Sequence, residues 1–282
     1  MTAKRVAMIN MKGGVGKSTL TVNLAYELSA VAGRDNNILV VDLDPQFNAS
    51  QYMLGTSRYK SHVVATDRPT VWDIFEQRTR TPAKTRPAPP KPADVVVNVR
   101  SWSTNKLDLL PSRLELAWSL KQPGGKETLL KEFLDQVEDD YDLILIDCAP
   151  TESVLTSAAY YAADQIVVPV KPEFLSTIGL PLLATSIKDH NATRGAPKVS
   201  VTGIVFNHAS DYQPEEKLAK REVRAVAAEY EWNVLNSEVP YSRSFPKGAR
   251  EGKPLRSTSH ARKMQKSKLY AVAAEFARAV GI

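Results

Sequence analysis

The sequence has 282 residues and carries 37 Lys and Arg against 31 Asp and Glu, and its net charge of +6 favours an anionic partner such as nucleic acid or anionic lipid. A chain of this length can bury the core of one large domain or of two small ones. The lone Cys148 excludes an internal disulfide and a cysteine-rich metal site, while the short apolar runs and the lack of a signal-peptide core predict a soluble, cytoplasmic protein.

The first predicted element is an apolar strand over residues 5–10, which runs into a glycine-rich turn and then into a helix that begins at Ser18. The turn reads Lys-Gly-Gly-Val-Gly-Lys-Ser over residues 12–18. Its glycines allow positive φ angles, so backbone N–H groups can point at phosphate oxygens beside the positive end of the helix. Lys17 can reach β- and γ-phosphates, and the Ser18 hydroxyl can ligate Mg²⁺. The pattern predicts a polyphosphate site, although Met11 stands where the strict P-loop has glycine; the alternative is a glycine turn without a ligand.

The rest of the chain alternates apolar runs with helical periods, which predicts an α/β fold with a mostly parallel central sheet and helices on both faces. We expect an ordered segment over 106–112 and strands over 37–43, 141–147, 165–170, 199–207 and 234–239. Helices are expected over 71–77, from 114, and over 126–137, 178–190, 214–230 and 261–280. We expect a single domain over residues 1–282 with a proline-rich insertion at about 78–94. Because proline fixes φ and removes donors, residues 79–92 are predicted to form an extended, solvated loop.

Two predicted strands end in aspartates. Asp42 and Asp44 close the strand over 37–43, and Asp147 ends the strand over 141–147. The carboxyl ends of parallel strands form the ligand-binding edge of such a sheet, so Asp147 is placed to hold a Mg²⁺-bound water. The alternative for a strand-end carboxylate is a helix cap or a turn.

Three stretches together resemble the deviant-Walker-A ATPases of the ParA/MinD family, and most closely the small ParA-type partition ATPases. They are residues 12–18, Asp-Leu-Asp-Pro-Gln-Phe-Asn-Ala-Ser over 42–50, and Leu-Ile-Leu-Ile-Asp-Cys-Ala-Pro over 143–150. Residues 168–173, 203–207, 239–243 and 252–255 also fit, so the resemblance covers nearly the whole chain apart from the proline-rich insertion. It implies a P-loop NTPase fold, ATP and Mg²⁺ as cofactors, and slow, partner-stimulated hydrolysis of ATP to ADP and phosphate.

The resemblance also implies roles for individual residues. Lys12 matches the signature lysine that crosses to the nucleotide of the other subunit, so that two protomers sandwich ATP; a local salt bridge is the alternative. Asp44 resembles the residue that positions or polarises the attacking water. The implied nucleotide contacts are Lys12, Gly13, Gly14, Val15, Gly16, Lys17, Ser18, Thr19, Asn207 and Pro240, and the implied metal site comprises Ser18, Asp42 and Asp147.

The sequence departs from the family pattern at two places. Phe47 stands where a glycine usually follows Asp-Pro-Gln, which predicts a stiffer or differently packed switch loop. Cys148 and Ala149 replace the common Thr-Pro after the strand-end aspartate. Because neither change removes a charged group, both are compatible with hydrolysis.

A basic stripe lies on the predicted helix over 214–230. Its cations stand at i, i+3, i+4 and i+7, opposite an apolar stripe of Ala219, Val223, Val226 and Tyr230. The cations are Lys217, Lys220, Arg221 and Arg224. A second basic concentration runs over residues 243–268. The alternative is a solvated charged face, whereas the resemblance implies that an ATP-bound dimer binds DNA without sequence preference.

The leading functional hypothesis is a DNA-partition or cargo-positioning ATPase. Its ATP-dependent homodimer would coat nucleoid DNA until a ParB-like or cargo-adaptor protein stimulates hydrolysis. The alternative is a MinD-like membrane-associated positioning ATPase, which needs a basic amphipathic tail beyond the last helix. Because the sequence stops within that predicted helix, we expect no stable membrane association. The sequence does not identify the cargo.

Overall fold

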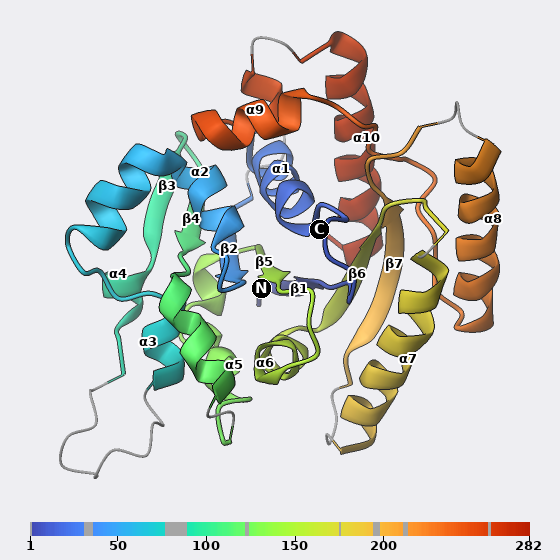
Figure 1. Cartoon of the computed structure of the whole chain (residues 1–282). Coiled ribbons are helices and arrows are strands. Elements are labelled where there is room, and N and C mark those ends of the chain that lie inside the picture. The colour runs from blue at the N-terminus through green and yellow to red at the C-terminus, as the bar shows by residue number, and fades with distance from the viewer. Residues whose placement is uncertain are drawn as a thin grey trace.

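The computed structural model describes residues 2–30, 36–76, 89–121, 124–174, 176–193, 198–210, 214–258 and 261–282. Within these ranges the strands form a seven-stranded sheet in the order β3-β4-β2-β5-β1-β6-β7 (Figure 1). The strands are β1 (Lys4–Met8), β2 (Ile38–Leu43), β3 (Val97–Ser101), β4 (Lys106–Leu110), β5 (Leu143–Cys148), β6 (Gln165–Val170) and β7 (Ser200–Phe206). Neighbouring strands pair in parallel, except that the edge strand β3 runs antiparallel to β4. The predicted mostly parallel α/β fold is confirmed.

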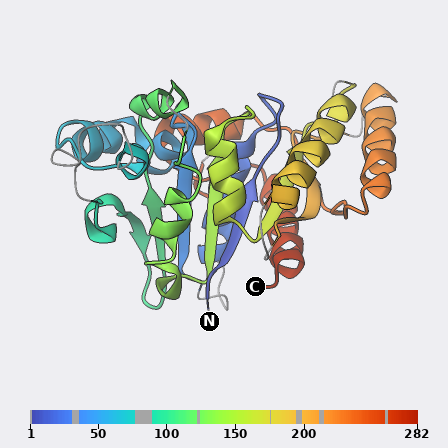
Figure 2. The same cartoon turned by 90° about the horizontal axis from the view of Figure 1, so that it is seen from below.

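Helices cover both faces of the sheet (Figures 1 and 2). One face carries α1 (Lys17–Ala30), α2 (Asn48–Tyr59), α9 (Ser244–Glu251) and α10 (Lys263–Val280). The other face carries α3 (Val71–Glu76), α5 (Leu129–Leu134), α6 (Val154–Ala162) and α7 (Ser176–Thr193), and α8 (Pro214–Glu229) packs beside α7. Shorter elements are α4 (Pro92–Val95), a π-helical turn (Lys60–Val64) and 3₁₀ helices over Leu114–Lys121, Glu138–Asp140 and Leu255–Ser257.

The central strand β5 shows why the sheet is buried on both sides. Leu143 and Leu145 join the hydrophobic cluster on one face, and Ile144 and Ile146 join the cluster on the other. All four side chains are completely buried. Successive side chains of a strand point to opposite faces, so an unbroken apolar run is the pattern of a strand covered by helices twice. Each such side chain contributes about 1.5–3 kcal/mol through its burial.

The predicted strand over 234–239 is wrong. This segment runs beside β7 but makes only isolated bridges, Ile204 to Val234 and Ala209 to Pro240. Between them, the backbone N–H groups of Asn236 and Ser237 donate to the Glu275 carboxylate at 2.8 Å each. The carboxylate from α10 therefore takes the donors that a continuous ladder would need.

Other differences concern whole elements that the sequence patterns missed or made too long. The sequence patterns missed α2, α6, α9 and β3, and the helix expected over 126–137 is α5, which covers only its middle. Residues 79–88 of the proline-rich stretch lie outside the described residues. At its described end Lys91 is extended (φ −75°, ψ 147°), and α4 begins at Pro92, the last residue of the predicted loop, where the fixed φ of proline suits the first turn of a helix. None of the helices in the described ranges combines the length and apolar character needed to cross a bilayer.

Two glycines allow α2 and α9 to touch through their backbones. Gly252 has a φ of +64° and Gly55 a φ of +70°, and a Cβ added at Gly252 would lie 2.7 Å from the Gly55 Cα. We expect Gly252→Ala to lower the free energy of unfolding by about 2–4 kcal/mol, because it combines left-handed strain with a backbone clash. Urea denaturation measures the loss.

The matched control is Gly125→Ala. Gly125 has a φ of +75°, but a Cβ added there meets no heavy atom within 4 Å. Only the left-handed strain remains, so this substitution should cost about 1–2 kcal/mol. Equal losses for the two variants would contradict the close contact between α2 and α9.

Candidate active site

The glycine-rich turn lies at the carboxyl edge of the sheet, between the end of β1 and the start of α1. From this edge the chain crosses from β1 toward β2 on one side and from β5 toward β6 on the other, which makes the β1/β5 boundary a topological switch point. Gly14 and Gly16 adopt φ angles of +75° and +81°, which side chains rarely tolerate. The turn needs glycine at both positions.

A cavity of about 370 Å³ opens over this turn. Several residues expected to contact nucleotide line it, namely Gly13, Gly14, Gly16, Lys17, Ser18 and Thr19. Asp44, Gln46, Asn48, Tyr52, Pro150 and Ala249 complete the lining. Motif reasoning missed Gln46, Asn48, Tyr52, Pro150 and Ala249, although Gln46, Asn48 and Pro150 lie within the stretches that carry the resemblance.

The Lys17 side chain lies across the turn. Its Nζ donates to the carbonyl oxygens of Asn10 at 3.0 Å and Lys12 at 3.1 Å, and the side chain is buried. Burial lowers the Lys17 pKa, while the negative charge of Asp147 opposes that shift most strongly. The ammonium group therefore already points toward the loop that would surround a phosphate.

Asn207 stabilises the glycine-rich turn through hydrogen bonds to its backbone. Its amide donates to the carbonyl oxygens of Val15 at 2.8 Å and Gly16 at 3.2 Å, and it is buried. A Cβ at Gly16 would collide with this amide, which is a second reason for glycine there. Neither Asn207 nor Pro240 lines the cavity, and Pro240 instead forms a bridge with Ala209 after β7.

Asp42 and Asp147 lie directly opposite each other, because β2 and β5 pair in register. Asp42 accepts the backbone N–H and the hydroxyl of Ser50, both at 2.7 Å, so it stabilises the first turn of α2. Burial raises the Asp42 pKa to about 7, against the effect of these hydrogen bonds. Asp42 therefore caps a helix, which was the alternative role considered for a strand-end carboxylate.

Asp147 has no such partners. Both of its carboxylate oxygens are buried without a hydrogen bond of ordinary geometry to any described residue. Burial, followed by the charge of Asp42, raises the Asp147 pKa well above its usual range, and the nearby Ser18 hydroxyl and Lys17 only partly oppose the rise. Buried charges normally require a partner, so this carboxylate leaves a favourable place for a cation.

The residues present fit a magnesium ion. Ser18 and Asp147 supply a hydroxyl and a carboxylate, the hard oxygen ligands that Mg²⁺ uses together with waters and substrate phosphates. The described part of the chain holds no group of three or more His, Cys, Asp or Glu side chains that could bind a metal alone. A cation here would complete its ligands with waters and phosphate oxygens.

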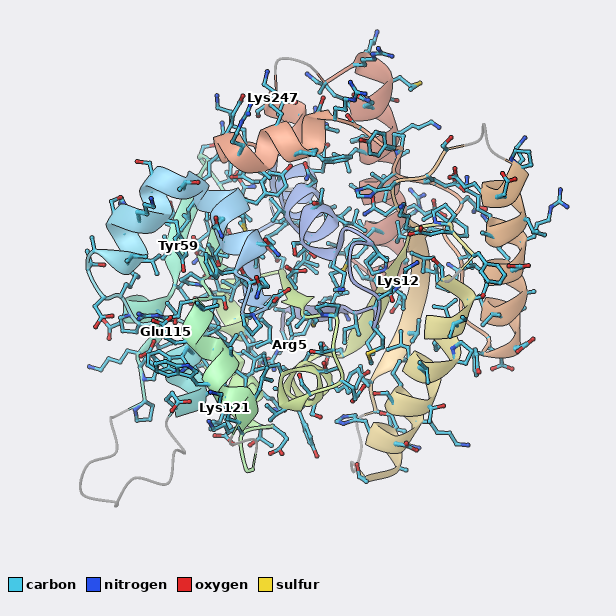
Figure 3. The ribbon with its side chains drawn as sticks, in the orientation of Figure 1. Arg5, Lys12, Tyr59, Glu115, Lys121 and Lys247 are labelled. Carbon is cyan, nitrogen blue, oxygen red and sulfur yellow. The ribbon has the colours of Figure 1, made fainter. Side chains whose placement is uncertain are left out.

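The two residues expected to act in catalysis lie on opposite sides of the turn. Asp44 is buried at the cavity wall, where its Oδ1 accepts the Gln46 N–H at 2.9 Å. Lys12 (Figure 3) places its Nζ 3.3 Å from Oε1 of Glu173, which also pairs with Lys171 at 3.3 Å. The single chain thus shows the local salt bridge that was the alternative role for Lys12.

The basic stripe on α8 is narrower than predicted. Lys217, Arg221 and Arg224 are exposed, but Lys220 is only 8% exposed. Lys220 is buried because its ammonium group turns inward to pair with the Glu238 carboxylate at 2.6 Å. Tyr230, expected in the apolar stripe, is 37% exposed and packs against Trp232.

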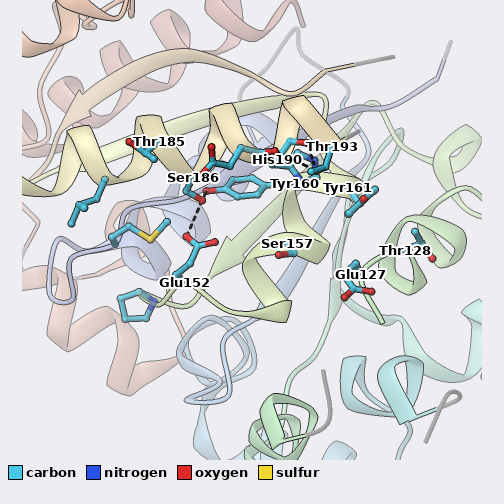
Figure 4. Close-up of a pocket in the computed structure, with 14 residues that line it drawn as sticks. Glu127, Thr128, Glu152, Ser157, Tyr160, Tyr161, Thr185, Ser186, His190 and Thr193 are labelled. Carbon is cyan, nitrogen blue, oxygen red and sulfur yellow. Dashed lines mark hydrogen bonds between the residues drawn. The ribbon is translucent and has the colours of Figure 1, made fainter. Parts of the chain in front are cut away.

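A larger cavity of about 820 Å³ lies between α6 and α7 (Figure 4). It reaches the glycine-rich turn at Met11 and Pro150, and its wall contains the hydrogen bond from the Ser186 hydroxyl to Glu152 at 2.8 Å. The residues that line this cavity include no Lys or Arg, so it differs chemically from the smaller cavity over the glycine-rich turn. No sequence motif predicted this cavity.

The Asp147 environment predicts an unusual pH dependence of stability without metal. A raised pKa means that the folded state keeps a proton that the unfolded state has released, so stability falls as pH rises above the usual carboxyl range. We expect the isosteric Asp147→Asn to raise the melting temperature at pH 8 by about 3–8 °C. At pH 5 the gain should be smaller, because the raised pKa leaves more of the Asp147 carboxyl protonated there than at pH 8. A lower melting temperature for the variant at pH 8 would contradict this account.

Comparison with known proteins places the chain in a family. Residues 3–196 match the AAA domain family. The chain is 30% identical over 257 residues to the chromosome-partitioning ATPase Soj of Treponema pallidum, covering 90% of this chain and 89% of that protein. It is 29% identical over 257 residues to the chromosome partitioning protein ParA of Caulobacter vibrioides, covering 89% and 85%.

Solved structures share the fold. The apo form of Cyanothece McdA superimposes with a TM-score of 0.76 at 20% identity, covering 97% of this chain and 99% of that one. A Borrelia burgdorferi plasmid partition protein bound to AMPPNP gives a TM-score of 0.74 at 20% identity, covering 98% and 99%. The chain therefore belongs to the ParA-type ATPases of the AAA domain family.

Proposed function

We propose that this protein is an ATP-dependent partition or cargo-positioning ATPase that works as a switchable dimer on DNA. Two chains sandwich ATP, the dimer binds nucleoid DNA without sequence preference, and a ParB-like or cargo-adaptor protein stimulates hydrolysis and release. The observation that carries the proposal is the buried, unpartnered Asp147 carboxylate beside Ser18 and Lys17 at the glycine-rich turn. The relative from Treponema is named a chromosome-partitioning ATPase, and the Borrelia neighbour holds an ATP analogue.

The site residues have distinct tasks in this proposal. Lys17 exchanges its two backbone carbonyl contacts for β- and γ-phosphate oxygens, while the N–H groups of the turn surround the β-phosphate. Ser18 and Asp147 hold Mg²⁺, which supplies positive charge to the phosphate oxygens when bound. Asp44, fixed at the cavity wall, accepts a hydrogen bond from the attacking water and orients it.

Lys12 supplies the link between subunits. In the single chain it rests on Glu173, whose side chain is 42% exposed, so the pair is screened by solvent and inexpensive to break. When a second chain approaches, Lys12 leaves Glu173 and reaches the nucleotide of its partner. There its charge stabilises the transferring phosphoryl group in a site from which water is excluded.

The DNA-binding surface is proposed to include the exposed cations of α8 and the basic residues of α9. On α9 these are Lys247 (Figure 3) and Arg250, with Lys253 following the helix. Two subunits side by side would double this positive surface. Because each neutralised phosphate releases counterions, dimerisation would strengthen DNA binding steeply.

We expect Lys12→Ala to bind ATP within about threefold of wild-type affinity but to remain monomeric with AMPPNP and Mg²⁺, as measured by light scattering after size exclusion. Turnover should fall by about a hundredfold, since a charge aimed at the transition state is lost. Lys171→Ala is the matched control, because it also removes one salt bridge to Glu173 and leaves the turn intact. Dimerisation of Lys12→Ala would contradict the role given to this lysine.

DNA binding can be tested with random-sequence duplex in gel shifts. Wild-type protein should bind only with ATP or AMPPNP, and the combined variant Arg221→Ala, Arg224→Ala should bind about tenfold more weakly and reduce the salt slope by about 2. Lys188→Ala removes an exposed cation from α7 and should bind like wild type. If DNA retention is the same without nucleotide, the proposed switch is wrong.

A further inference from the structure

Phe47 occupies a backbone conformation that a large side chain rarely adopts. Its φ is +44° and its ψ +36°, in the left-handed region, at the residue that precedes α2. Phe47 directly follows the segment with Asp44 and Gln46, and both of these residues line the cavity over the glycine-rich turn. Strain of this kind persists only where the surroundings hold the residue in place.

The Phe47 ring is held by Tyr59, twelve residues later at the other end of α2. The two rings stack with centroids 5.2 Å apart and planes inclined by 10°. Tyr59, labelled in Figure 3, is buried, and its hydroxyl donates to the carbonyl oxygen of Ser112 at 2.8 Å. The ring that supports Phe47 is therefore itself fixed to the chain beyond β4.

The same hydrogen-bond network returns to the active site. The Ser112 N–H donates to Oγ of Ser50 at 2.9 Å, and that hydroxyl donates to Asp42 at 2.7 Å. On the loop itself, the Phe47 N–H donates to the Asp44 carbonyl at 2.8 Å, and the Phe47 carbonyl accepts the Gln51 N–H at 3.0 Å. The loop is thus closed by contacts within this chain.

We propose that the Phe47–Tyr59 stack is a clamp that keeps the switch loop, residues 44–47, ordered before nucleotide binds, and that Phe47 is a positioning residue for Asp44. The claim that Phe47 positions Asp44 rests on the role proposed above for Asp44. The claim that the stack keeps the loop ordered does not. A consequence is that nucleotide changes the order of this loop little, so the protein's response to ATP must arise outside residues 44–47.

Hydrogen–deuterium exchange of the full chain tests the clamp directly. Without nucleotide, the amides of residues 46–51 should be protected in wild type and change less than about twofold on addition of AMPPNP and Mg²⁺. Phe47→Gly and Phe47→Asn both accept a positive φ but lack the ring, so exchange at these amides should be about tenfold faster. AMPPNP should restore the protection in both variants.

Phe47→Tyr is the conservative variant, and it should keep wild-type protection because it keeps the ring. Exchange in β5 should be unchanged in every variant, which separates loss of the clamp from loss of the fold. Wild-type protection in Phe47→Gly and Phe47→Asn would overturn the proposal, as would a wild-type loop that is protected only after AMPPNP is added.

Turnover tests the positioning role separately. Phe47→Gly should lower kcat by about tenfold with KM for ATP within about twofold, and Phe47→Tyr should restore kcat. Faster exchange with unchanged kcat would support the clamp and count against the role given to Asp44. An equal loss of kcat in Phe47→Gly and Phe47→Tyr would overturn the positioning role.

Discussion

The site depends on negative charge buried at the carboxyl edge of the sheet. Strand register places Asp42 beside Asp147 on neighbouring central strands, and both are completely buried. Two carboxylates in this position repel each other and lose their hydration, and the pKa of each is raised. The glycine-rich turn brings Lys17 toward the same point, but that ammonium is hydrogen-bonded to backbone carbonyls. The residues of the site therefore supply little positive charge to offset the two buried carboxylates.

Identical side chains take different roles here because their surroundings differ. Both carboxylate oxygens of Asp42 accept hydrogen bonds, one from the Asp44 N–H and the other from Ser50. Asp42 therefore organises α2 and the loop that carries Asp44. Asp147 retains both oxygens for a ligand. A third carboxylate, Asp44, is turned toward the cavity by the Gln46 N–H. One edge of the sheet thus carries a helix-capping, an unpaired buried and a cavity-facing carboxylate.

The fold and the phosphate site could be predicted where the signal is local. The strands that carry Asp42 and Asp147 are unbroken apolar runs, and the glycine-rich turn is contiguous. Prediction failed where distant contacts decide the structure: Glu275 captures the donors of residues 236–237, and Glu238 draws Lys220 inward. The helix α9 contains Pro246 and Gly248, which argue against a helix locally. Its packing on α2 through Gly55 and Gly252 overrides that preference.

The helix α1, which begins at the end of the glycine-rich turn, is hydrogen-bonded to both regions that the proposed cycle must connect. Asn23 donates to the Tyr52 hydroxyl of α2 at 3.0 Å and accepts the Leu255 N–H at 2.8 Å, and Glu27 forms a two-point ion pair with Arg256. Asn23 and Glu27 are buried, so these contacts are shielded from solvent. With the loop before α2 already clamped, a shift of α1 on binding phosphate would be carried toward the basic segment after α9. The proposed coupling between nucleotide and DNA would then have a continuous physical route through α1.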